Sequence, residues 1–518
     1  MRQVALSVAG IFACAVLVSA QQLGSISFQT SGSPAAQASF IEGVKDLHSF
    51  EFDEAAEAFQ KAQQIDPNFA LAYWGEAMSY NHPLWAQQDL PAAKKALERL
   101  APTLDGRVAK APTDKEKAYL EAVNQLFYAP GDKLARDNAY SDAMARMYER
   151  WPDDHEVDIF YALSLLGTVR PGDHGFRRQA LAASIALKVF QENPNHPGAA
   201  HFIIHAFDDP DHAILALPAA RVYAKIAPSA PHALHMPSHI FVQLGMWQDV
   251  AASNTVAYKA AMDLVQRMHL PEGREDFHTL SWLEYANLML GRFDEANKDV
   301  DLAKQAVDRN PHNAGIDQQY HTMLARYILE TGKWQKISLS ESPAAGAPEH
   351  ESMPGMPGMG GSSGGAAWIF IAGLSAAKLG DAGEAERARS MIGSMRQNME
   401  KQGQAYAAKP FAMMENELAS SVQLARGENA AALKFAKQAS DIEATLSAPS
   451  GPPEPIKPAM EFYGDVLLAA GRPAEAATAY KQELLRTPNR TPSVKGLAAA
   501  TAKTETGIGA NGSHERRQ

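Results

Sequence analysis

The sequence predicts an all-α protein, arranged as a right-handed α–α superhelix of antiparallel helix pairs, and three observations lead to this prediction. Signals for β-strands are almost absent, while long Ala-rich stretches place apolar residues at helical intervals. Pro, Gly and Asn-Pro pairs mark the short breaks between these stretches. One spacing of small, aromatic and Pro residues recurs near both ends of the chain. A solenoid of short helices accounts for all three observations.

The clearest repeat unit lies within residues 36–69. Gly43 is followed twelve residues later by Ala55, and Phe59 comes four residues after that. Pro67 then stops the second helix of the unit. Small residues let two antiparallel helices cross closely, while the aromatic ring fills the space toward the next pair. The same offsets recur far along the chain at Gly464, Ala476, Tyr480 and Pro488.

The turns between paired helices share a second pattern, Gly-x-x-x-Glu-Ala, in which three residues separate the Gly from a Glu-Ala pair. It occurs at Gly291–Ala296, Gly380–Ala385 and Gly471–Ala476. The Gly permits a left-handed turn at the end of one helix, and the Glu places negative charge near the start of the next. Together these patterns resemble tetratricopeptide repeats over most of residues 36–490. Successive turns are roughly 40–48 residues apart, however, and the usual repeat has 34 residues.

Three further segments resemble a group of exported bacterial tetratricopeptide proteins. They are Asn81–Trp85, His201–His205 and His235–His239. That resemblance implies fold and export, and carries no established activity. Tetratricopeptide arrays form a concave surface that holds peptides or partner proteins, so the resemblance implies a binding scaffold with a protein or peptide partner.

Composition excludes several classes of protein. The chain of 518 residues has a net charge of −11, from 48 basic and 59 acidic residues, so no surplus of Lys and Arg is available for nucleic acid. Cys14 is the single cysteine, which excludes a disulfide framework, a Cys-based zinc site and an iron–sulfur cluster.

The chain divides into six predicted segments. An apolar run with a small-residue end near Ala20 indicates a signal peptide that is cleaved after Ala20, although an uncleaved anchor stays an alternative. We therefore expect a periplasmic or secreted protein without stable membrane insertion after cleavage. The segments are 1–20 signal peptide, 21–35 disordered leader, 36–340 N-terminal helical array with a His-rich groove, 341–366 Pro/Gly/Met-rich flexible insert, 367–502 C-terminal helical array and 503–518 disordered tail.

Histidines provide the strongest chemical signal. Of 17 in the chain, six fall between residues 201 and 239. His201 and His205 are four residues apart and share a helix face, and so do His235 and His239. Pro237 predicts that a helix begins just after His235. Two such pairs on neighbouring helices would hold one divalent transition metal, with His232 or Asp208 as a supplementary ligand.

Three interpretations of these histidines stay open on sequence alone. They are hydrogen-bonded core residues, metal ligands, or members of a metal-free acid–base or ligand-binding groove. No Glu follows His201 or His235, so the His-Glu-x-x-His motif of zinc hydrolases is absent and no general base stands at the expected place. Glu284, or Asp208 and its acidic neighbours, would have to take that role.

Further aromatic and polar residues are candidates for the groove. They lie beside aromatic residues near expected helix ends and are His82, Trp85, His278, Glu284 and His321. The alternative for each is ordinary packing within a repeat. Four other histidines occur in polar loops and are expected to be solvated; these are His155, His174, His196 and His312.

Two functions therefore compete. The first is an exported scaffold that binds a protein or peptide partner, with a His-rich site in its inner groove. The alternative is a metal-binding protein or metal-assisted enzyme that uses His201, His205, His235 and His239. The sequence assigns no catalytic residue and leaves enzymatic activity undecided.

Overall fold

The computed structural model describes residues 22–170, 172–173, 175–270, 276–339 and 363–512. The helices of the N-terminal half are α1 Pro34–His48, α2 Phe52–Ile65, α3 Ala70–Ser79, α4 Leu90–Leu100, α5 Leu104–Val108, α6 Asp114–Tyr128, α7 Lys133–Arg150, α8 His155–Leu166, α9 Arg177–Glu192, α10 Pro197–Ala206, α11 Ala213–Ile226, α12 Pro231–His235 and α13 Pro237–Gln243. Those of the C-terminal half are α14 Trp247–Arg267, α15 Phe277–Met289, α16 Phe293–Arg309, α17 Ala314–Thr331, α18 Ser363–Lys378, α19 Ala382–Lys401, α20 Lys409–Ala425, α21 Asn429–Glu443, α22 Ala459–Ala469, α23 Pro473–Arg486 and α24 Thr491–Gly512.

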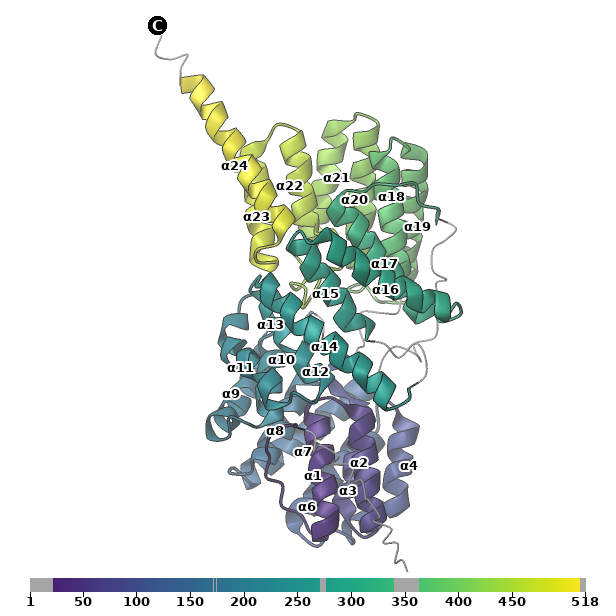
Figure 1. Cartoon of the computed structure of the whole chain (residues 1–518), viewed down its shortest axis with the longest axis vertical. Helices are drawn as coiled ribbons and strands as arrows, with labels where there is room; N and C mark the ends of the chain where they lie inside the picture. The colour runs from purple at the N-terminus through teal and green to yellow at the C-terminus, as the bar shows by residue number, and fades with distance from the viewer. Residues whose placement is uncertain (1–21, 171, 174, 271–275, 340–362, 513–518) are drawn as a thin grey trace, which may run out of the picture.

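Consecutive helices pack against one another along the whole array. Contacts join α1 to α2, α2 to α3 and so on toward α23 and α24, except that α4 and α5 each pack on α6. The helices succeed one another along the long axis, from the purple N-terminal end to the yellow C-terminal end (Figure 1). In the described part of the chain, β-structure is limited to strand β1 (Asn81–His82) paired antiparallel with β2 (Gln87–Gln88) around the short η1 helix (Pro83–Trp85). The prediction of an all-α superhelix of helix pairs is confirmed.

The repeat pattern works as the spacing predicts. A Cβ atom on Gly43 would lie 3.0 Å from the ring of Phe59, and one on Gly464 would lie 2.8 Å from the ring of Tyr480. Both glycines therefore let an aromatic ring of the next helix approach the backbone. The turn glycine Gly291 has φ +72°, the left-handed conformation that the Gly-x-x-x-Glu-Ala pattern predicts.

Residues 22–33 differ from the prediction of a disordered leader. Leu23 and Phe28 are both buried at 2% exposure, and the ring of Phe28 lies 5.3 Å from the ring of Phe40. The hydroxyl of Ser31 donates a 2.7 Å hydrogen bond to Glu116. The disorder prediction was wrong here because two well-placed apolar side chains and a few hydrogen bonds are enough to hold a short extended segment on the array.

The other predicted boundaries meet the structure in different ways. The tail predicted as disordered from residue 503 is helical as far as Gly512, as a continuation of α24 beyond its Ala-rich stretch at residues 498–502. Helix α18 begins at Ser363, inside the predicted insert 341–366, whose earlier residues lie outside the described ones. The predicted signal peptide, residues 1–20, also lies outside the described residues.

Within the described residues, none of the helices combines the length and apolarity needed to span a bilayer.

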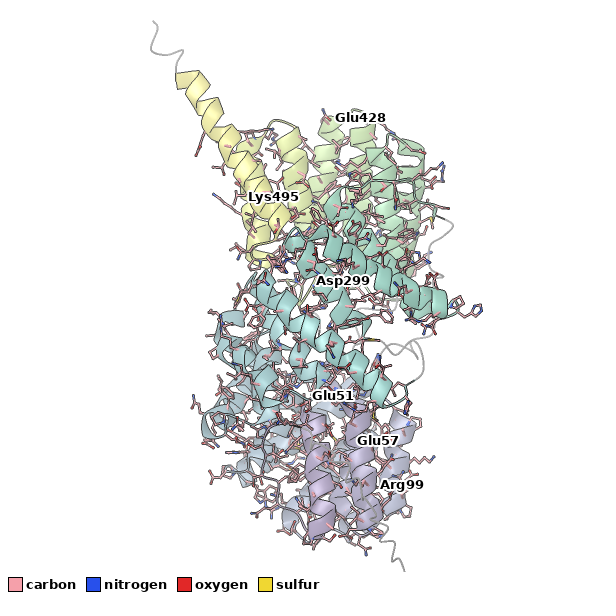
Figure 2. The ribbon with its side chains drawn as sticks, viewed as in Figure 1. Glu51, Glu57, Arg99, Asp299, Glu428 and Lys495 are labelled. Atoms are coloured by element: carbon pink, nitrogen blue, oxygen red, sulfur yellow. The ribbon has the colours of Figure 1, made fainter. Side chains whose placement is uncertain are left out.

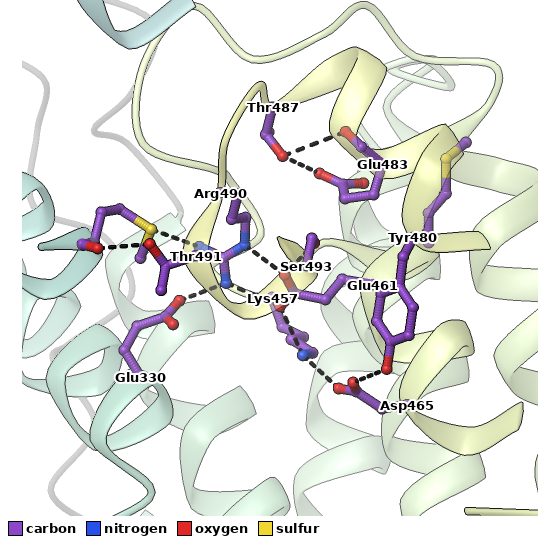
Figure 3. A network of polar contacts seen from close by, with 12 residues as sticks. Glu330, Lys457, Glu461, Asp465, Tyr480, Glu483, Thr487, Arg490, Thr491 and Ser493 are labelled. Atoms are coloured by element: carbon purple, nitrogen blue, oxygen red, sulfur yellow. Dashed lines mark hydrogen bonds and ion pairs between the residues drawn. The ribbon is translucent and has the colours of Figure 1, made fainter. Parts of the chain in front are cut away.

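A buried polar network joins the C-terminal helices to the centre of the array (Figure 3). Arg490, 1% exposed, contacts Glu461 at 2.9 Å and also pairs with Glu330 of α17. Its guanidinium additionally donates to the hydroxyl of Tyr285 in α15 at 3.2 Å. The hydroxyl of Thr491 donates to the Met289 carbonyl at 2.6 Å. The turn between α23 and α24 is therefore held to α15 and α17 by charged hydrogen bonds.

Glu417, another buried carboxyl group in the C-terminal half, has no cationic partner of the kind that Arg490 gives to Glu461. Neither side-chain oxygen of Glu417 in α20 has a hydrogen-bond partner among the described residues, and the residue has no solvent exposure. Burial, and then the negative charge of Glu443, raise the pKa of Glu417 well above its usual value of 4.5. The folded protein therefore retains this proton at a pH where the unfolded chain has released it.

Glu417 should make the protein less stable as pH rises. Since the folded state binds the extra proton, the stabilisation is complete below the unfolded pKa and is lost as pH rises toward the folded value. We expect Glu417→Gln to reduce the pH slope of the unfolding free energy, by up to about 1.4 kcal/mol per pH unit, in urea denaturation between about pH 5 and about pH 8. The exposed Glu428, labelled in Figure 2, provides the control Glu428→Gln, and an equal slope in both variants would contradict this account.

Candidate metal centre

Six histidines from four helices meet in the middle of the array. Helix α10 carries His201 and His205 one turn apart, because the spacing of four places both on one face. His232 and His235 belong to the short helix α12. Pro237 begins α13 as predicted, and α13 carries His239; the sixth histidine, His278, lies in the first turn of α15.

The six imidazoles form two groups of three, each turned inward through Nε2. In the first triad, Nε2 of His201 lies 3.0 Å from Nε2 of His205 and 3.2 Å from Nε2 of His232. The second triad comprises His235, His239 and His278. Here Nε2 of His235 lies 3.2 Å from Nε2 of His239 and 3.0 Å from Nε2 of His278.

The two triads are neighbours. The ring centroids of His205 and His239 are 6.0 Å apart, and those of His232 and His235 are 6.3 Å apart. The four ligands predicted from sequence therefore lie in one region, but they do not converge on one point. His201 and His205 belong to the first triad, while His235 and His239 belong to the second. The prediction of a single ion shared by these four is replaced by two separate groups.

Hydrogen bonds on the outer nitrogens fix which nitrogen faces inward. His201 donates from Nδ1 to the backbone carbonyl of His48 at 2.7 Å. His235 donates from Nδ1 to Oδ1 of Asn254 at 2.6 Å, while the amide of Asn254 donates to the Val250 carbonyl. A neutral imidazole carries one N–H, so both histidines present a bare Nε2 lone pair to their triad.

His239 is oriented in the same way by a carboxylate. Its Nδ1 donates to Asp208 at 2.7 Å, and Gln243 donates to the other carboxylate oxygen at 3.3 Å. Metal-ligating histidines commonly have such an outer partner, which holds the ring and raises its basicity. Asp208, predicted as a supplementary ligand, is instead the support of a histidine.

Hydrogen bonds among the rings cannot satisfy all three Nε2 atoms of the first triad. The single Nε2 lone pair of His201 faces two imidazole nitrogens, His205 and His232, and accepts a good hydrogen bond from only one of them. A metal ion would accept a lone pair from all three rings at once. Ligand nitrogens around tetrahedral zinc are about 3.4 Å apart, from Zn–N bonds of about 2.0–2.1 Å. The distances of 3.0 and 3.2 Å in the first triad are close to this spacing.

Burial also keeps five of the rings neutral, which is the form that binds metal. It lowers the pKa of His201 and of His235 to about 3. Desolvation, followed by the neighbouring histidines, lowers the pKa of three further rings well below 6.5; these are His205, His232 and His278. These five neutral imidazoles offer lone pairs and no charge of their own.

A third polar group stands behind the first triad. The Glu156 carboxylate, fully buried, lies 2.8 Å from Nε2 of His48 and 3.2 Å from Nε2 of His196. Burial alone would raise the pKa of Glu156, but the two histidines lower it to about 2. His196 was predicted to be solvated, and this was wrong: it caps α10 by accepting a hydrogen bond from the Ala199 amide. The Glu156 carboxylate therefore places a negative charge next to the ring of His48, and the backbone carbonyl of His48 accepts the hydrogen bond from His201.

Aromatic rings enclose the triads. The ring of Phe50 lies 4.4 Å from the ring of His201, and the ring of Trp282 lies 4.5 Å from the ring of His239. Gly451, from the segment before α22, packs so closely on Trp282 that a Cβ atom would lie 2.4 Å from the indole. The C-terminal half of the chain therefore completes the wall of the second triad.

A pocket of about 140 Å³ opens onto the histidines. His232, His235 and His278 form part of its lining, so both triads are reached from the same space. The rest of the lining comes from the start of α2, the end of α14 and the start of α15. A ligand in this pocket would meet the open side of any ion held by the triads.

Of the remaining groove candidates, two lie beside the pocket and two pack elsewhere in the array. His82 stacks at 4.0 Å on Phe52, a pocket residue, and Trp85 lies 5.3 Å from Phe50, so both stand behind the pocket wall. Glu284 is buried and accepts a 2.8 Å hydrogen bond from Arg326. His321 donates to the Asp317 carbonyl and packs on Trp368. These last two take no part in the triads.

Sequence reasoning missed the outer partners of the histidines. His48 acts through its backbone carbonyl, which leaves no side-chain signature. Asn254 is one of several polar residues on α14, and only its contact with His235 distinguishes it. Phe50 has φ +58°, a left-handed conformation unusual for an aromatic residue, and no local pattern predicts it.

The outer partner of His239 provides a test that leaves the ligands intact. We expect Asp208→Asn to weaken metal binding at the second triad by about 10–100-fold, because the amide does not hold His239 as a charged acceptor does. Competition with a chromophoric chelator measures this affinity. Asp209→Asn is the matched control, since Asp209 pairs with His212 outside the triads. Equal affinities in the two variants would show that Asp208 has no role at the centre.

Comparisons with known proteins give little beyond general helical likeness. No protein-family model matches the chain, and no curated protein matches it. Among solved structures, the P58(IPK) TPR domain shares 11% identity over 91% of this chain and 99% of its own, with a TM-score of 0.23. Yeast Tom70 shares 11% identity over 92% and 96%, with a TM-score of 0.31. The Rap protein complexed with Competence and Sporulation Factor shares 11% over 78% and 100%, with a TM-score of 0.32. The fold assignment rests on the helix-pair packing described above.

Proposed function

We propose that this protein binds a pair of transition-metal ions, one in each histidine triad, at the floor of the pocket. One observation carries the proposal: in each triad one central Nε2, that of His201 or of His235, lies 3.0 Å from one of the other two Nε2 atoms and 3.2 Å from the other, and all three rings offer a ligand atom within 4.8 Å of one another. The outer hydrogen bonds of His201, His235 and His239 hold those lone pairs inward. Imidazole ligands suit zinc, copper, iron and nickel, whereas magnesium, calcium and manganese prefer oxygen.

The open pocket favours a catalytic use of these ions over a purely structural one. Structural zinc sites are closed by four protein ligands, while catalytic sites keep a position for water or substrate. Each triad supplies three ligands, and His232, His235 and His278 line the pocket directly. An ion held there would polarise a bound oxygen or activate water. We therefore infer a metal-assisted enzyme in which the histidines hold the ions and the pocket holds the substrate.

Metal stoichiometry tests this proposal. The mature chain, purified without a His tag and freed of metal, would be loaded separately with Zn²⁺, Cu²⁺ and Co²⁺, dialysed and measured by elemental mass spectrometry. We expect two ions per chain for at least one metal, together with a raised melting temperature. If the chain retains no ion and its melting temperature does not change, the metal function is refuted and the six histidines are hydrogen-bonded core residues.

Partner binding is a second candidate function. Stacked helix pairs create an extended surface suited to peptides, as the repeat resemblance implies. Ile214 and Leu215 on α11 are 58% and 55% exposed, so α11 presents two adjacent apolar side chains to solvent. Panning a displayed peptide library against the chain tests this role. Enriched apolar peptides whose binding is lost in Ile214→Asp would support it, and no enrichment would count against it.

Export is also part of the proposal. The apolar N-terminal run ends in small residues before Gln21, as expected for a cleaved signal peptide. N-terminal sequencing of the protein recovered outside the bacterial cytoplasm should give a chain that begins at Gln21. A chain that begins at Met1 and stays in the cytoplasm would contradict it.

A further inference from the structure

We propose that the pocket over the triads binds a small organic cation, with a positively charged amine at the pocket mouth and an apolar body of about one aromatic ring. This inference rests on the proposed metal function, because it assigns the substrate class of the same site. It comes from the size of the pocket, its apolar walls and the charges at its mouth.

The size and walls of the pocket set the apolar part of the ligand. A volume of about 140 Å³ is close to the roughly 150 Å³ of an apolar protein cavity that holds benzene. The apolar lining includes Phe50 and Phe52 around the start of α2, and Leu264, Val265 and Met268 near the end of α14. These side chains have no groups to hydrogen bond a polar body. A flat ring or short alkyl group would bury well between them.

The charges at the mouth set the polar part of the ligand. Glu51, Asp53 and Glu54 line the pocket at the start of α2, and Asp276 lines it just before α15. Glu51 accepts a 3.0 Å hydrogen bond from the backbone amide of His232, and Asp276 accepts one of 3.0 Å from the amide of Thr279. None of the described lining residues is Lys or Arg. Arg267 acts on Glu54 electrostatically but does not line the pocket. Burial raises the pKa of Glu51, Glu54 and Asp276 above their ordinary values, so these groups hold protons more tightly than free carboxyls do. The lining is nevertheless acidic and has no cationic side chain among its described residues, so it would attract an ammonium group and repel an anion.

The arrangement also orients the ligand. Phe50 is buried and packs on the rings of His201 and His232, so it marks the deep end. Asp53 is exposed and Glu54 is partly exposed, so they mark the mouth. In Figure 2, Glu51 lies at the end of α2 nearest the middle of the molecule and Glu57 lies farther along that helix. The amine would stay at the mouth, away from the positive ions, and the apolar end would approach the metals.

Three probes with one skeleton and different charges test this inference. Isothermal titration would compare phenethylammonium, 2-phenylethanol and phenylacetate on the full metal-loaded chain. We expect the cation to bind about tenfold more tightly than the neutral alcohol, and phenylacetate to bind least. Glu54→Gln should remove that preference, while Glu57→Gln, at an exposed position outside the pocket lining, should retain it. Leu264→Trp should weaken all binding by filling the pocket.

The outcomes separate this inference from the metal function. Equal binding of the three probes, or no binding of any, would overturn the organic-cation assignment, while two retained ions would leave the metal function standing. Slower metal loading in Glu54→Gln, without probe binding to the wild type, would also overturn it and would make the carboxylates an entry route for metal ions. A chain that retains no metal would instead fail the metal function.

Discussion

Replacing Arg490 with alanine should destabilise the C-terminal helices by about 3–5 kcal/mol, because the change leaves the buried Glu330 without its Arg490 partner and Glu461 with only Lys457 as a cation. The guanidinium of Arg490 is 1% exposed and pairs with Glu461 and Glu330, each at most 4% exposed. It also reaches Tyr285 in α15, so its loss separates the last repeat from the centre of the array. Chemical denaturation followed by circular dichroism would show the transition of these helices at a lower urea concentration.

An exposed ion pair gives the control for this prediction. Arg472 and Glu475 pair on the surface of the same region, with side chains 45% and 53% exposed. Solvent screens such pairs, so Arg472→Ala should leave the urea midpoint unchanged. Similar midpoints for Arg490→Ala and Arg472→Ala would contradict a structural role for the buried network.

Single substitutions in the triads should each remove one metal ion. His205→Ala leaves the first triad with two ligands, and His278→Ala does the same to the second. Loss of a direct ligand should weaken binding by more than about 100-fold, beyond the effect of losing an outer partner. Elemental analysis should therefore give one ion per chain for each variant and none for the double variant. Both residues are only partly buried, so the fold should tolerate alanine.

Histidines outside the triads provide the matching controls. His155 forms a surface pair with Glu192, and His321 packs on Trp368. His155→Ala and His321→Ala should both retain two ions. If a control loses metal as the triad variants do, or the triad variants keep two ions, the assignment of ligands is wrong.

The features predicted from sequence are those set within one helix or one turn. Gly43 and Phe59 predict a close helix crossing because their spacing alone brings ring and backbone together. The pairing of His201 with His205 follows from helical periodicity in the same way. Pro237 likewise marks the start of α13.

The features that escaped prediction depend on contacts between distant helices. His278 joins His235 across 43 residues, and no local spacing relates them. Division of the histidines into two triads follows from how α10, α12 and α15 pack, so the sequence alone suggested one shared ion. Phe28 escaped because a short polar leader with one well-placed ring has the composition of a disordered segment.

The central claim is that two metal ions lie between the six Nε2 atoms. The measurement that tests it most directly is an anomalous difference map from a crystal of the metal-loaded protein, collected at the absorption edge of the bound metal. We predict two peaks of similar height, one within bonding distance of His201, His205 and His232, and one at His235, His239 and His278. A single peak shared by the triads, peaks confined to the surface, or none at these rings would contradict the two-ion account.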